Sequence, residues 1–266
     1  MPHNIEYLID GSRAFVTLDR PEKHNGVTIE MMRELIRVGN DIRKHRDIRA
    51  VVISGNGPSF CSGLDIAKAA KDPIAAVLNF LPIPWLGTNT YQECCWVWRR
   101  LPVPVIASIH GNCFGAGLQL ALAADFRFAT PDAEFSVMEA RYGLVPDMTG
   151  AQTLAELVGV DTAKLLTMTA DVIDGTDAKA LGLVTGLAAD PRAAAIELAD
   201  RIETRSPDAV AGAKKMFTDT WTSSARQTFA VERLTQLRML LGANAAIARK
   251  AGLARQTPEF EPRQLR

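Results

Sequence analysis

Four short runs rich in β-branched and aromatic residues recur in the first half of the chain. They lie at residues 14–18, 49–54, 103–108 and 125–129, and turn-forming residues follow each of them. Such runs are typical of strands. Segments of helical character lie between them, and this alternation predicts an α/β fold with largely parallel strands. It does not distinguish a doubly wound sheet, a barrel or a coiled stack of repeats.

Two of the intervening segments have helical patterns. Residues 28–45 place Met31, Leu35 and Ile42 on one stripe, as a helix with a single apolar face does. Residues 117–124 are almost wholly apolar, which predicts a buried helix.

The last third of the chain has helical stripes without strands between them. Ser206 and Pro207 resemble an N-cap followed by proline at the first helical position, and residues 225–241 carry apolar side chains mostly three or four apart. We therefore expect a core at residues 1–190 and a helical region at residues 191–266. That region either mediates assembly or packs on its own core. Its C-terminal tail has little to bury, so we expect it to be loose.

Composition limits the classes of function. The chain has 266 residues, of which 47% are hydrophobic, with thirty basic and thirty acidic residues. This balance gives no overall field that attracts nucleic acid or an anionic membrane. No apolar run reaches the roughly 18 residues of a membrane span, and the N-terminus has no signal-peptide pattern. We expect neither a nucleic-acid partner nor a membrane span.

The four cysteines are Cys61, Cys94, Cys95 and Cys113. A bridge between the adjacent Cys94 and Cys95 would be strained, and no cysteine or histidine cluster has zinc spacing. Small buried hydrophobic residues are their usual role. We expect reduced thiols and a cytoplasmic protein.

Two glycine-rich segments lie at residues 54–68 and 110–125. Gly115 and Gly117 flank Ala116 where the buried helix must begin, and N–H groups at a helix start are free to meet an anion. The spacing matches neither a P-loop nor a dinucleotide fingerprint. One use is an oxyanion hole, with a second donor from the earlier segment. The other is close packing between helix and strand.

Two carboxylates flank a tight turn in apolar surroundings. Glu139 follows a strand-like run, and Asp147 follows a turn that contains Gly143 and Pro146. Burying an unpartnered carboxylate costs free energy, so each acid has a structural task or the pair does chemistry. Asp147 could be the N-cap of a helix that starts at Met148. Beside an oxyanion hole, the pair suits proton transfer through an enolate.

Several short motifs occur in a fixed order along the chain and include most of the residues discussed above. They are RPEKHN at 20–25, FCSGLDI at 60–66, PVIA at 104–107, HG at 110–111, GAG at 115–117, AD at 124–125, GLVP at 143–146, and DAKA and GLV within 177–184.

Together the motifs resemble the crotonase superfamily, also called the enoyl-CoA hydratase/isomerase family, across essentially the whole chain. The resemblance implies a spiral of ββα repeats, followed by a C-terminal helical region that forms a homotrimer or a dimer of trimers. It implies an acyl-CoA thioester as substrate, and no metal or redox cofactor.

Carried over by position, the family's oxyanion hole falls on the backbone N–H groups of Leu64 and Ala116. The family usually has glycine at the second position, but alanine keeps the N–H. Taken alone, Asp65 is typical of a cap or turn and Lys23 of an ordinary exposed lysine. The residues that the resemblance places at the coenzyme A thioester are Lys23, Gly63, Asp65, Ile66, Gly115 and Gly117.

The acids distinguish the subfamilies. Hydratases of the family carry two glutamates, and here Gln119 occupies the first position and Glu139 the second. An amide can hold a water molecule but cannot take its proton. The spacing from Glu139 to Asp147 resembles the dienoyl-CoA isomerases, although those usually have an acid at the Gln119 position too.

We therefore predict catalytic roles for Glu139, Asp147 and Gln119 in converting a 3,5-dienoyl-CoA to a 2,4-dienoyl-CoA. Glu139 would take a proton from C2, Asp147 would return one at C6, and Gln119 would orient substrate or water. The alternatives are a 2-enoyl-CoA hydratase, a non-catalytic acyl-CoA-binding protein, or another reaction of the superfamily. Segment 69–98 is expected to shape the acyl pocket. Its apolar walls would come from Phe80, Leu81, Pro82, Trp85 and Trp96, which could equally be core residues.

Overall fold

The structure is a computed structural model that describes residues 4–265. Its strands are β1 (Ile5–Asp10), β2 (Arg13–Leu18), β3 (Ala50–Gly55), β4 (Val105–Ile109), β5 (Asn112–Phe114), β6 (Phe126–Ala129), β7 (Glu134–Ser136), β8 (Ile173–Asp174) and β9 (Gly186–Leu187).

Helices occupy most of the remaining chain. They are η1 (Pro21–Lys23), α1 (Ile29–Ile42), α2 (Ile66–Ala69), α3 (Pro73–Leu78), α4 (Thr90–Arg99), α5 (Ala116–Leu122), η2 (Met138–Tyr142), α6 (Gly150–Val158), α7 (Val160–Thr169), α8 (Gly175–Ala180), α9 (Pro191–Glu203), α10 (Pro207–Thr220), α11 (Ala225–Leu241) and α12 (Ala243–Ala254), where η marks a 3-10 helix.

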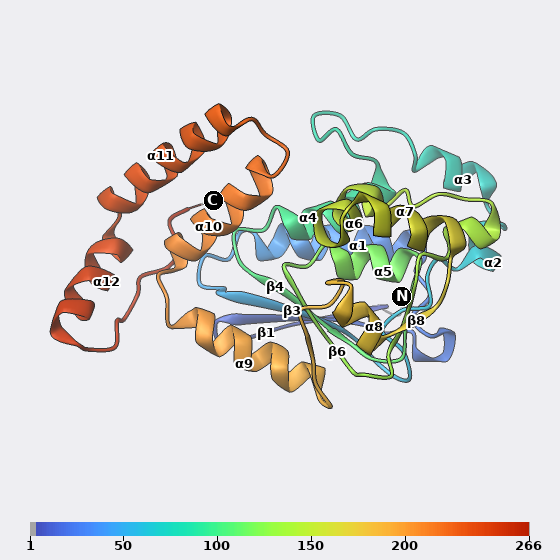
Figure 1. Cartoon of the computed structure of the whole chain (residues 1–266), viewed down its shortest axis with the longest axis horizontal. Coiled ribbons are helices and arrows are strands. Elements are labelled where there is room, and N and C mark those ends of the chain that lie inside the picture. The colour runs from blue at the N-terminus through green and yellow to red at the C-terminus, as the bar shows by residue number, and fades with distance from the viewer. Residues whose placement is uncertain (1–3, 266) are drawn as a thin grey trace.

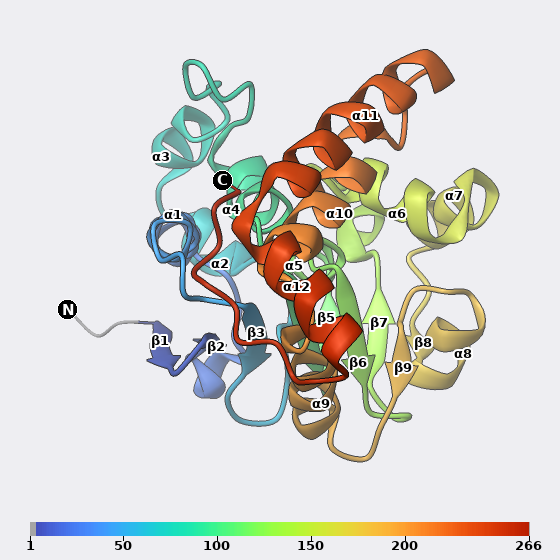
Figure 2. The same ribbon diagram turned by 90° about the vertical axis from the view of Figure 1, so that its left-hand side faces the viewer.

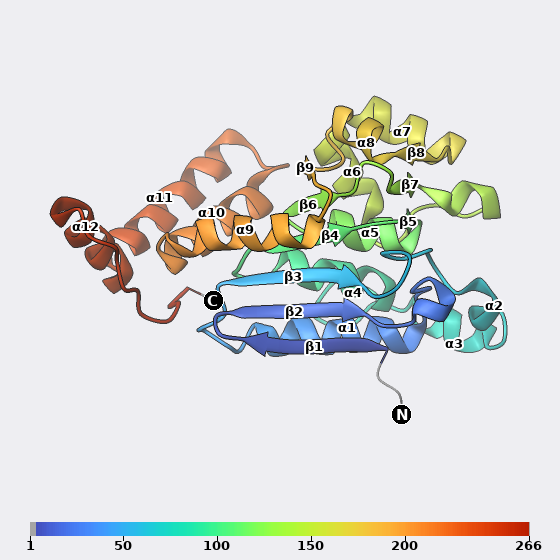
Figure 3. The ribbon, with the colours of Figure 1, turned by 90° about the horizontal axis from the view of Figure 1, so that it is seen from below.

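Two sheets organise the described residues. The larger has the strand order β1-β2-β3-β4-β6-β9, and the smaller has the order β5-β7-β8. In the larger sheet β1 pairs antiparallel with β2, while the other neighbours pair parallel. Figure 3 shows β1, β2 and β3 side by side, with α1 behind them. The predicted α/β class with largely parallel strands is confirmed.

β3 is buried along its whole length, because α9 packs on one of its faces and the main core lies on the other. Val51 belongs to the main core together with Met31 of α1. Val52 points to the opposite face and packs with Ala195 and Ala199 of α9. A strand covered on both sides has a continuous apolar run instead of an alternating one.

The four predicted strands correspond to β2, β3, β4 and β6, and the two predicted helices to α1 and α5. Thr28 begins α1 by accepting a hydrogen bond from the N–H of Met31 at 3.3 Å, as N-cap residues do. The sequence patterns missed β1, which is largely exposed, and the short strands β5, β8 and β9. Runs of two or three residues are too short to show a period.

The C-terminal helices begin on the sheet and then leave it. α9 contacts β3, β4 and β6, whereas α11 and α12 lie beyond α10, away from the strands (Figures 1 and 3). Figure 2 shows the same helices from the side that faces away from most of the strands. Ser206 caps α10, with Pro207 in its first turn, as predicted. The boundary at residue 190 stays a prediction. No helix within residues 4–265 combines the length and apolar character that crossing a membrane requires.

Lys214 fastens α10 to the core. Its side chain is buried, and its ammonium group lies 2.7 Å from a carboxylate oxygen of Asp125. It also donates to the carbonyl oxygens of Trp98 and Val103 at 2.9 and 3.0 Å. These partners satisfy all three donors of the ammonium group, as a buried charge requires.

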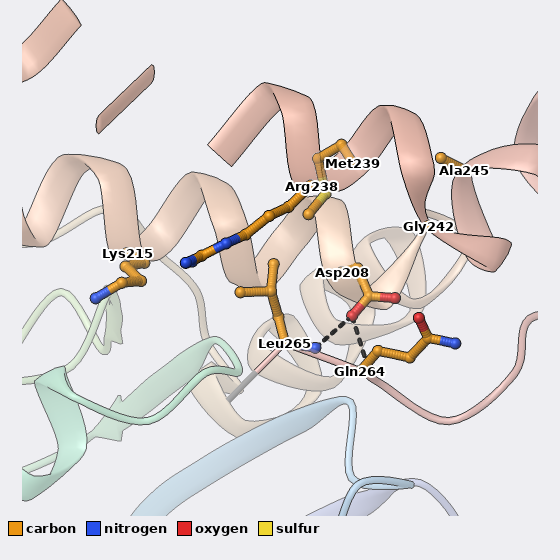
Figure 4. A pocket seen from close by; sticks show the side chains of 8 residues that line it. All are labelled: Asp208, Lys215, Arg238, Met239, Gly242, Ala245, Gln264 and Leu265. Atoms are coloured by element: carbon orange, nitrogen blue, oxygen red, sulfur yellow. Dashed lines mark hydrogen bonds between the residues drawn. The ribbon is translucent and has the colours of Figure 1, made fainter. Parts of the chain in front are cut away.

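The C-terminal tail is held in place, so the expectation of a loose tail is wrong. Asp208 of α10 accepts hydrogen bonds from the N–H groups of Gln264 and Leu265 at 2.7 and 2.8 Å (Figure 4). Arg263 is only 2% exposed, and its N–H donates to the carbonyl of Arg46. The tail is ordered by polar contacts with distant residues, which its own apolar pattern does not predict.

Candidate active site

One cavity of about 420 Å³ collects most of the predicted site residues. Its walls come from the segment before α2, the start of α5, the helix η2 and the turn after η2. This volume is within the usual range for a small-molecule site. The predicted residues that line it are Gly63, Leu64, Ile66, Gly115, Ala116, Glu139 and Asp147.

The two glycine-rich loops meet at this cavity. A Cβ atom on Gly63 would lie 3.3 Å from the carbonyl oxygen of Phe114 and 3.9 Å from the amide nitrogen of Ala116. Within residues 4–265, neither the N–H of Leu64 nor that of Ala116 donates to another backbone group. Ala116 is the first residue of α5, so helix geometry leaves its N–H free. Two unpaired donors are therefore available, one from each loop.

The glycines of these loops have two different tasks. Gly63 and Gly115 have φ values of 104° and 48°, a region that side-chain-bearing residues rarely adopt. Gly117 instead permits close packing, since a Cβ atom there would lie 2.5 Å from the Cβ of Cys61. Both uses considered for the glycines are therefore present, at different positions.

Glu139 lies on η2 and is 9% exposed. Its Oε1 accepts a hydrogen bond from Nε2 of Gln119 at 2.7 Å. Its Oε2 is buried and has no hydrogen-bond partner among the described residues. Burial raises the pKa of Glu139, and the charge of Asp147 raises it further, although hydrogen bonds from its own backbone and from Gln119 oppose the shift. A carboxylate in such a place is a stronger base than usual.

Asp147 lines the same cavity, and burial raises its pKa as well. The helix that follows, α6, starts at Gly150 with Thr149 at its N-cap position, and no side chain caps it. The alternative that Asp147 caps a helix starting at Met148 is therefore wrong.

Gln119 lies behind Glu139 and not on the cavity wall. It is fully buried in α5. Its Oε1 accepts hydrogen bonds from the N–H groups of Met148 and Gly150 at 2.8 and 2.9 Å. Protein groups therefore engage both ends of the amide, and the predicted direct contact with substrate or water has no support from this placement.

Asp65 and Lys23 do not line the cavity. Asp65 caps α2 by accepting from the N–H of Lys68 at 3.0 Å, and it pairs with Arg20 at 3.1 Å. Burial works against ionisation of Asp65, but these hydrogen bonds outweigh it and lower the pKa. Lys23 is exposed at the end of η1. A role for either residue in binding coenzyme A stays a prediction.

The sequence patterns missed several wall residues. Tyr91 of α4 lines the cavity, and its ring stacks on Phe80 with centroids 4.3 Å apart. Tyr142 of η2 also lines it. None of the five side chains expected from segment 69–98 lies on the wall of this cavity, and Trp85 is 92% exposed. Segment 69–98 thus contributes to this cavity, as expected, but through Tyr91 and not through the five side chains named for it.

Residues 9–255 match the family described as enoyl-CoA hydratase/isomerase. The mitochondrial Delta(3,5)-Delta(2,4)-dienoyl-CoA isomerase of Rattus norvegicus is 38% identical over 207 residues, which cover 75% of this chain and 63% of that protein. The match thus spans less than two thirds of that relative. Enoyl-CoA hydratase EchA19 of Mycobacterium tuberculosis is 27% identical over 259 residues, covering 95% of this chain and 94% of the relative.

A solved structure shows the same fold. The enoyl-CoA hydratase of a Polaromonas species superposes with a TM-score of 0.88 at 29% identity, covering 97% of this chain and 99% of that one. This likeness confirms the predicted crotonase-like fold.

Proposed function

The chain belongs to the enoyl-CoA hydratase/isomerase family, and on this premise we propose that it is an acyl-CoA double-bond isomerase. The most specific form of the proposal is conversion of a 3,5-dienoyl-CoA to a 2,4-dienoyl-CoA. One observation carries it: Glu139 and Asp147 line the same cavity as Leu64 and Ala116. Two acids beside two free N–H groups suit removal of a proton at one carbon and its return at another.

In this proposal the thioester oxygen accepts hydrogen bonds from the N–H groups of Leu64 and Ala116. Negative charge develops on that oxygen as the enolate forms. Each donor contributes about 3 kcal/mol to the transition state, because it is fixed in place before the charge appears. Gly63 and Ile66 would adjoin the thioester, and Lys23 would meet a phosphate of coenzyme A.

Glu139 then removes a proton from C2, and the electron pair of that C–H bond spreads over the thioester and the diene. Asp147 gives a proton to C6, which leaves the double bonds at positions 2 and 4. Glu139 ends protonated and Asp147 ionised, so a proton returns from one to the other through solvent before the next turnover. No metal or redox cofactor takes part.

The alternative of a 2-enoyl-CoA hydratase fits the site less well. Hydration needs a second carboxylate beside Glu139 to hold and activate water. Gln119 occupies that place, and its amide is engaged by Glu139, Met148 and Gly150. Relatives of both kinds match the chain, and the acid pattern favours the isomerase.

We also propose a homotrimer or a dimer of trimers as the working assembly. α11 has no buried residue along its 17 residues, and it exposes Phe229, Leu234 and Leu237 by more than half. A second copy of the chain would remove this apolar surface from water. The four cysteines are buried thiols, which fits the cytoplasmic location that we propose.

The change Glu139→Gln tests the catalytic proposal. The amide has nearly the same shape but cannot accept a proton from carbon, so isomerisation of a 3,5-dienoyl-CoA should fall by about 10²–10⁴-fold. The rate is measured from the absorbance of the product, whose diene is conjugated with the thioester carbonyl. Substrate affinity should persist, and it is measured by calorimetry. The control is Glu134→Gln, which alters an exposed glutamate on β7.

Normal rates in the Glu139→Gln variant would show that the mechanism is wrong. A wild-type protein that hydrates crotonyl-CoA but does not isomerise the diene would be a hydratase. Tight acyl-CoA binding without turnover on a panel of thioesters would indicate a binding protein.

A further inference from the structure

The amide of Gln119 has only one orientation that its surroundings accept. Two backbone N–H groups, those of Met148 and Gly150, point at one end of the amide at 2.8 and 2.9 Å. Only the amide oxygen can accept from them. The NH2 group must therefore face Glu139, whose Oε1 lies 2.7 Å away. A donor in this position stabilises the ionised form of a carboxyl group.

The same amide oxygen holds a strained part of the chain. Thr149, between its two N–H donors, has φ of 75°, which is rare for a β-branched residue. Its hydroxyl is buried and has no partner among the described residues. A conformation of this kind persists only where its surroundings enforce it. Asp147 lies two residues earlier, so Gln119 connects Glu139 to the turn that carries the second acid.

We propose that Gln119 is a positioning residue that keeps Glu139 ionised and fixes the Asp147 turn, through the single amide orientation that the fold permits. The role rests on the proposed function, since it assigns Glu139 as the base. Gln119 donates to Oε1 of Glu139, and Oε2 has no partner among the described residues. Besides the hydrogen bond from its own backbone, Glu139 thus has the Gln119 amide as the side-chain donor that favours its charged form.

The groups around Glu139 are few. Asp147 opposes its ionisation, and among residues 4–265 Tyr91 and Tyr142 are the other titratable groups on the cavity wall. Arg141, on the same helix as Glu139, donates instead to the carbonyl of Ala170 at 3.1 Å. The hydrogen bond from Gln119 is therefore the side-chain contact that favours the charged form of Glu139.

Two variants separate the tasks of Gln119. Gln119→Glu retains an oxygen for the N–H groups of Met148 and Gly150 but places a second carboxyl group against Glu139. Gln119→Met has a similar length but neither donates nor accepts strongly. The protein is labelled with ¹³C at the glutamate side-chain carboxyl, Glu139 is identified from the signal lost in Glu139→Gln, and its titration is followed by NMR.

In Gln119→Glu the titration midpoint of Glu139 should rise by about one pH unit or more, because two carboxyl groups in contact do not both ionise readily. The acid limb of the pH profile of kcat should move up with it. In Gln119→Met the midpoint should rise less, and the melting temperature should fall because two buried N–H groups lose their acceptor.

A merely structural role for Gln119 would lower stability in Gln119→Met and leave the titration of Glu139 unchanged in that variant, and this result would overturn the inference. The shift in Gln119→Glu shows only that the side chain at position 119 is in contact with Glu139. The titration does not depend on turnover. A wild-type protein that fails to isomerise dienoyl-CoA would therefore refute the proposed function, while the shift in Glu139 would still decide the role of Gln119.

Discussion

Asp147 and Glu139 are carboxyl groups whose pKa values are raised by burial in one cavity. In the proposed reaction a raised pKa helps the two residues in different ways. A raised pKa makes Glu139 a better base, and it helps Asp147 to stay protonated as an acid. The proposed reaction needs Glu139 ionised and Asp147 protonated, so its rate should fall at low pH as Glu139 is protonated and at high pH as Asp147 ionises. Because the two carboxyl groups interact, the two apparent pKa values of this pH–rate profile belong to the pair and not to either residue alone.

The change Asp147→Asn should lower isomerisation and alter the pH dependence of stability. The pKa of Asp147 is higher in the folded chain than the usual value of about 3.9 in an unfolded chain. Folding therefore favours its protonated form, and the free energy of unfolding falls as pH rises between those two pKa values. Asparagine removes this dependence, so the variant should gain stability relative to wild type as pH rises.

Urea unfolding at about pH 4 and about pH 8 measures this difference, and the isomerisation rate should fall by about 10²–10⁴-fold. Asp132→Asn changes an exposed aspartate and is the control. A stability difference that is the same at both pH values would contradict the raised pKa of Asp147.

The first turn of α5 supplies one of the two N–H donors of the proposed oxyanion hole. Ala116 is the first residue of this buried helix and follows Gly115, whose positive φ turns the chain into it. Proline is well tolerated at the first position of a helix, since its fixed φ suits the helix and its missing N–H has no intrahelical partner. The backbone donor can thus be removed without removing the helix.

Ala116→Pro should lower kcat by about 10²–10³-fold, the usual cost of losing one oxyanion-hole donor. Ala116→Gly retains the N–H and should stay close to wild type in rate. Circular dichroism and melting temperature show whether α5 persists. A well-folded proline variant with an undiminished rate would mean that the N–H of Ala116 does not contact the thioester oxygen.

The whole molecule has two differently packed parts. The sheet and its covering helices form the main core, whereas α11 and α12 contact α10 and each other, away from the strands. Lys214 and Asp208 tie α10 to the core and to the C-terminal tail. α11 keeps its apolar stripe exposed, so the stripe predicted from the sequence does not pack on this chain's own core.

Light scattering should give a mass of three or six chains for the wild type. The double change Leu234→Glu and Leu237→Glu places two charges on the exposed stripe of α11, and burial of unpaired charges is strongly unfavourable. The mass should therefore fall toward that of one chain. Gln236→Glu adds a charge elsewhere on the same helix and is the control. A double variant of unchanged mass would place the interface elsewhere.

Side-chain periodicity and capping act between residues a few positions apart, so the amino-acid pattern alone is enough to predict the periodic elements and the Ser206 cap. β3, α1 and α11 follow from such patterns, as does the cap at Ser206. The motif residues also suggested that Glu139 and Ala116 belong to one site.

The contacts of these residues become visible only in the folded chain. Gln119 is hydrogen-bonded to Glu139 and Met148, which are 20 and 29 residues away in the sequence. Asp208 is hydrogen-bonded to Gln264, which is 56 residues away. The wall position of Tyr91 is equally non-local. Such contacts depend on how distant elements pack and on which buried polar groups must find partners, and no short window of sequence contains either.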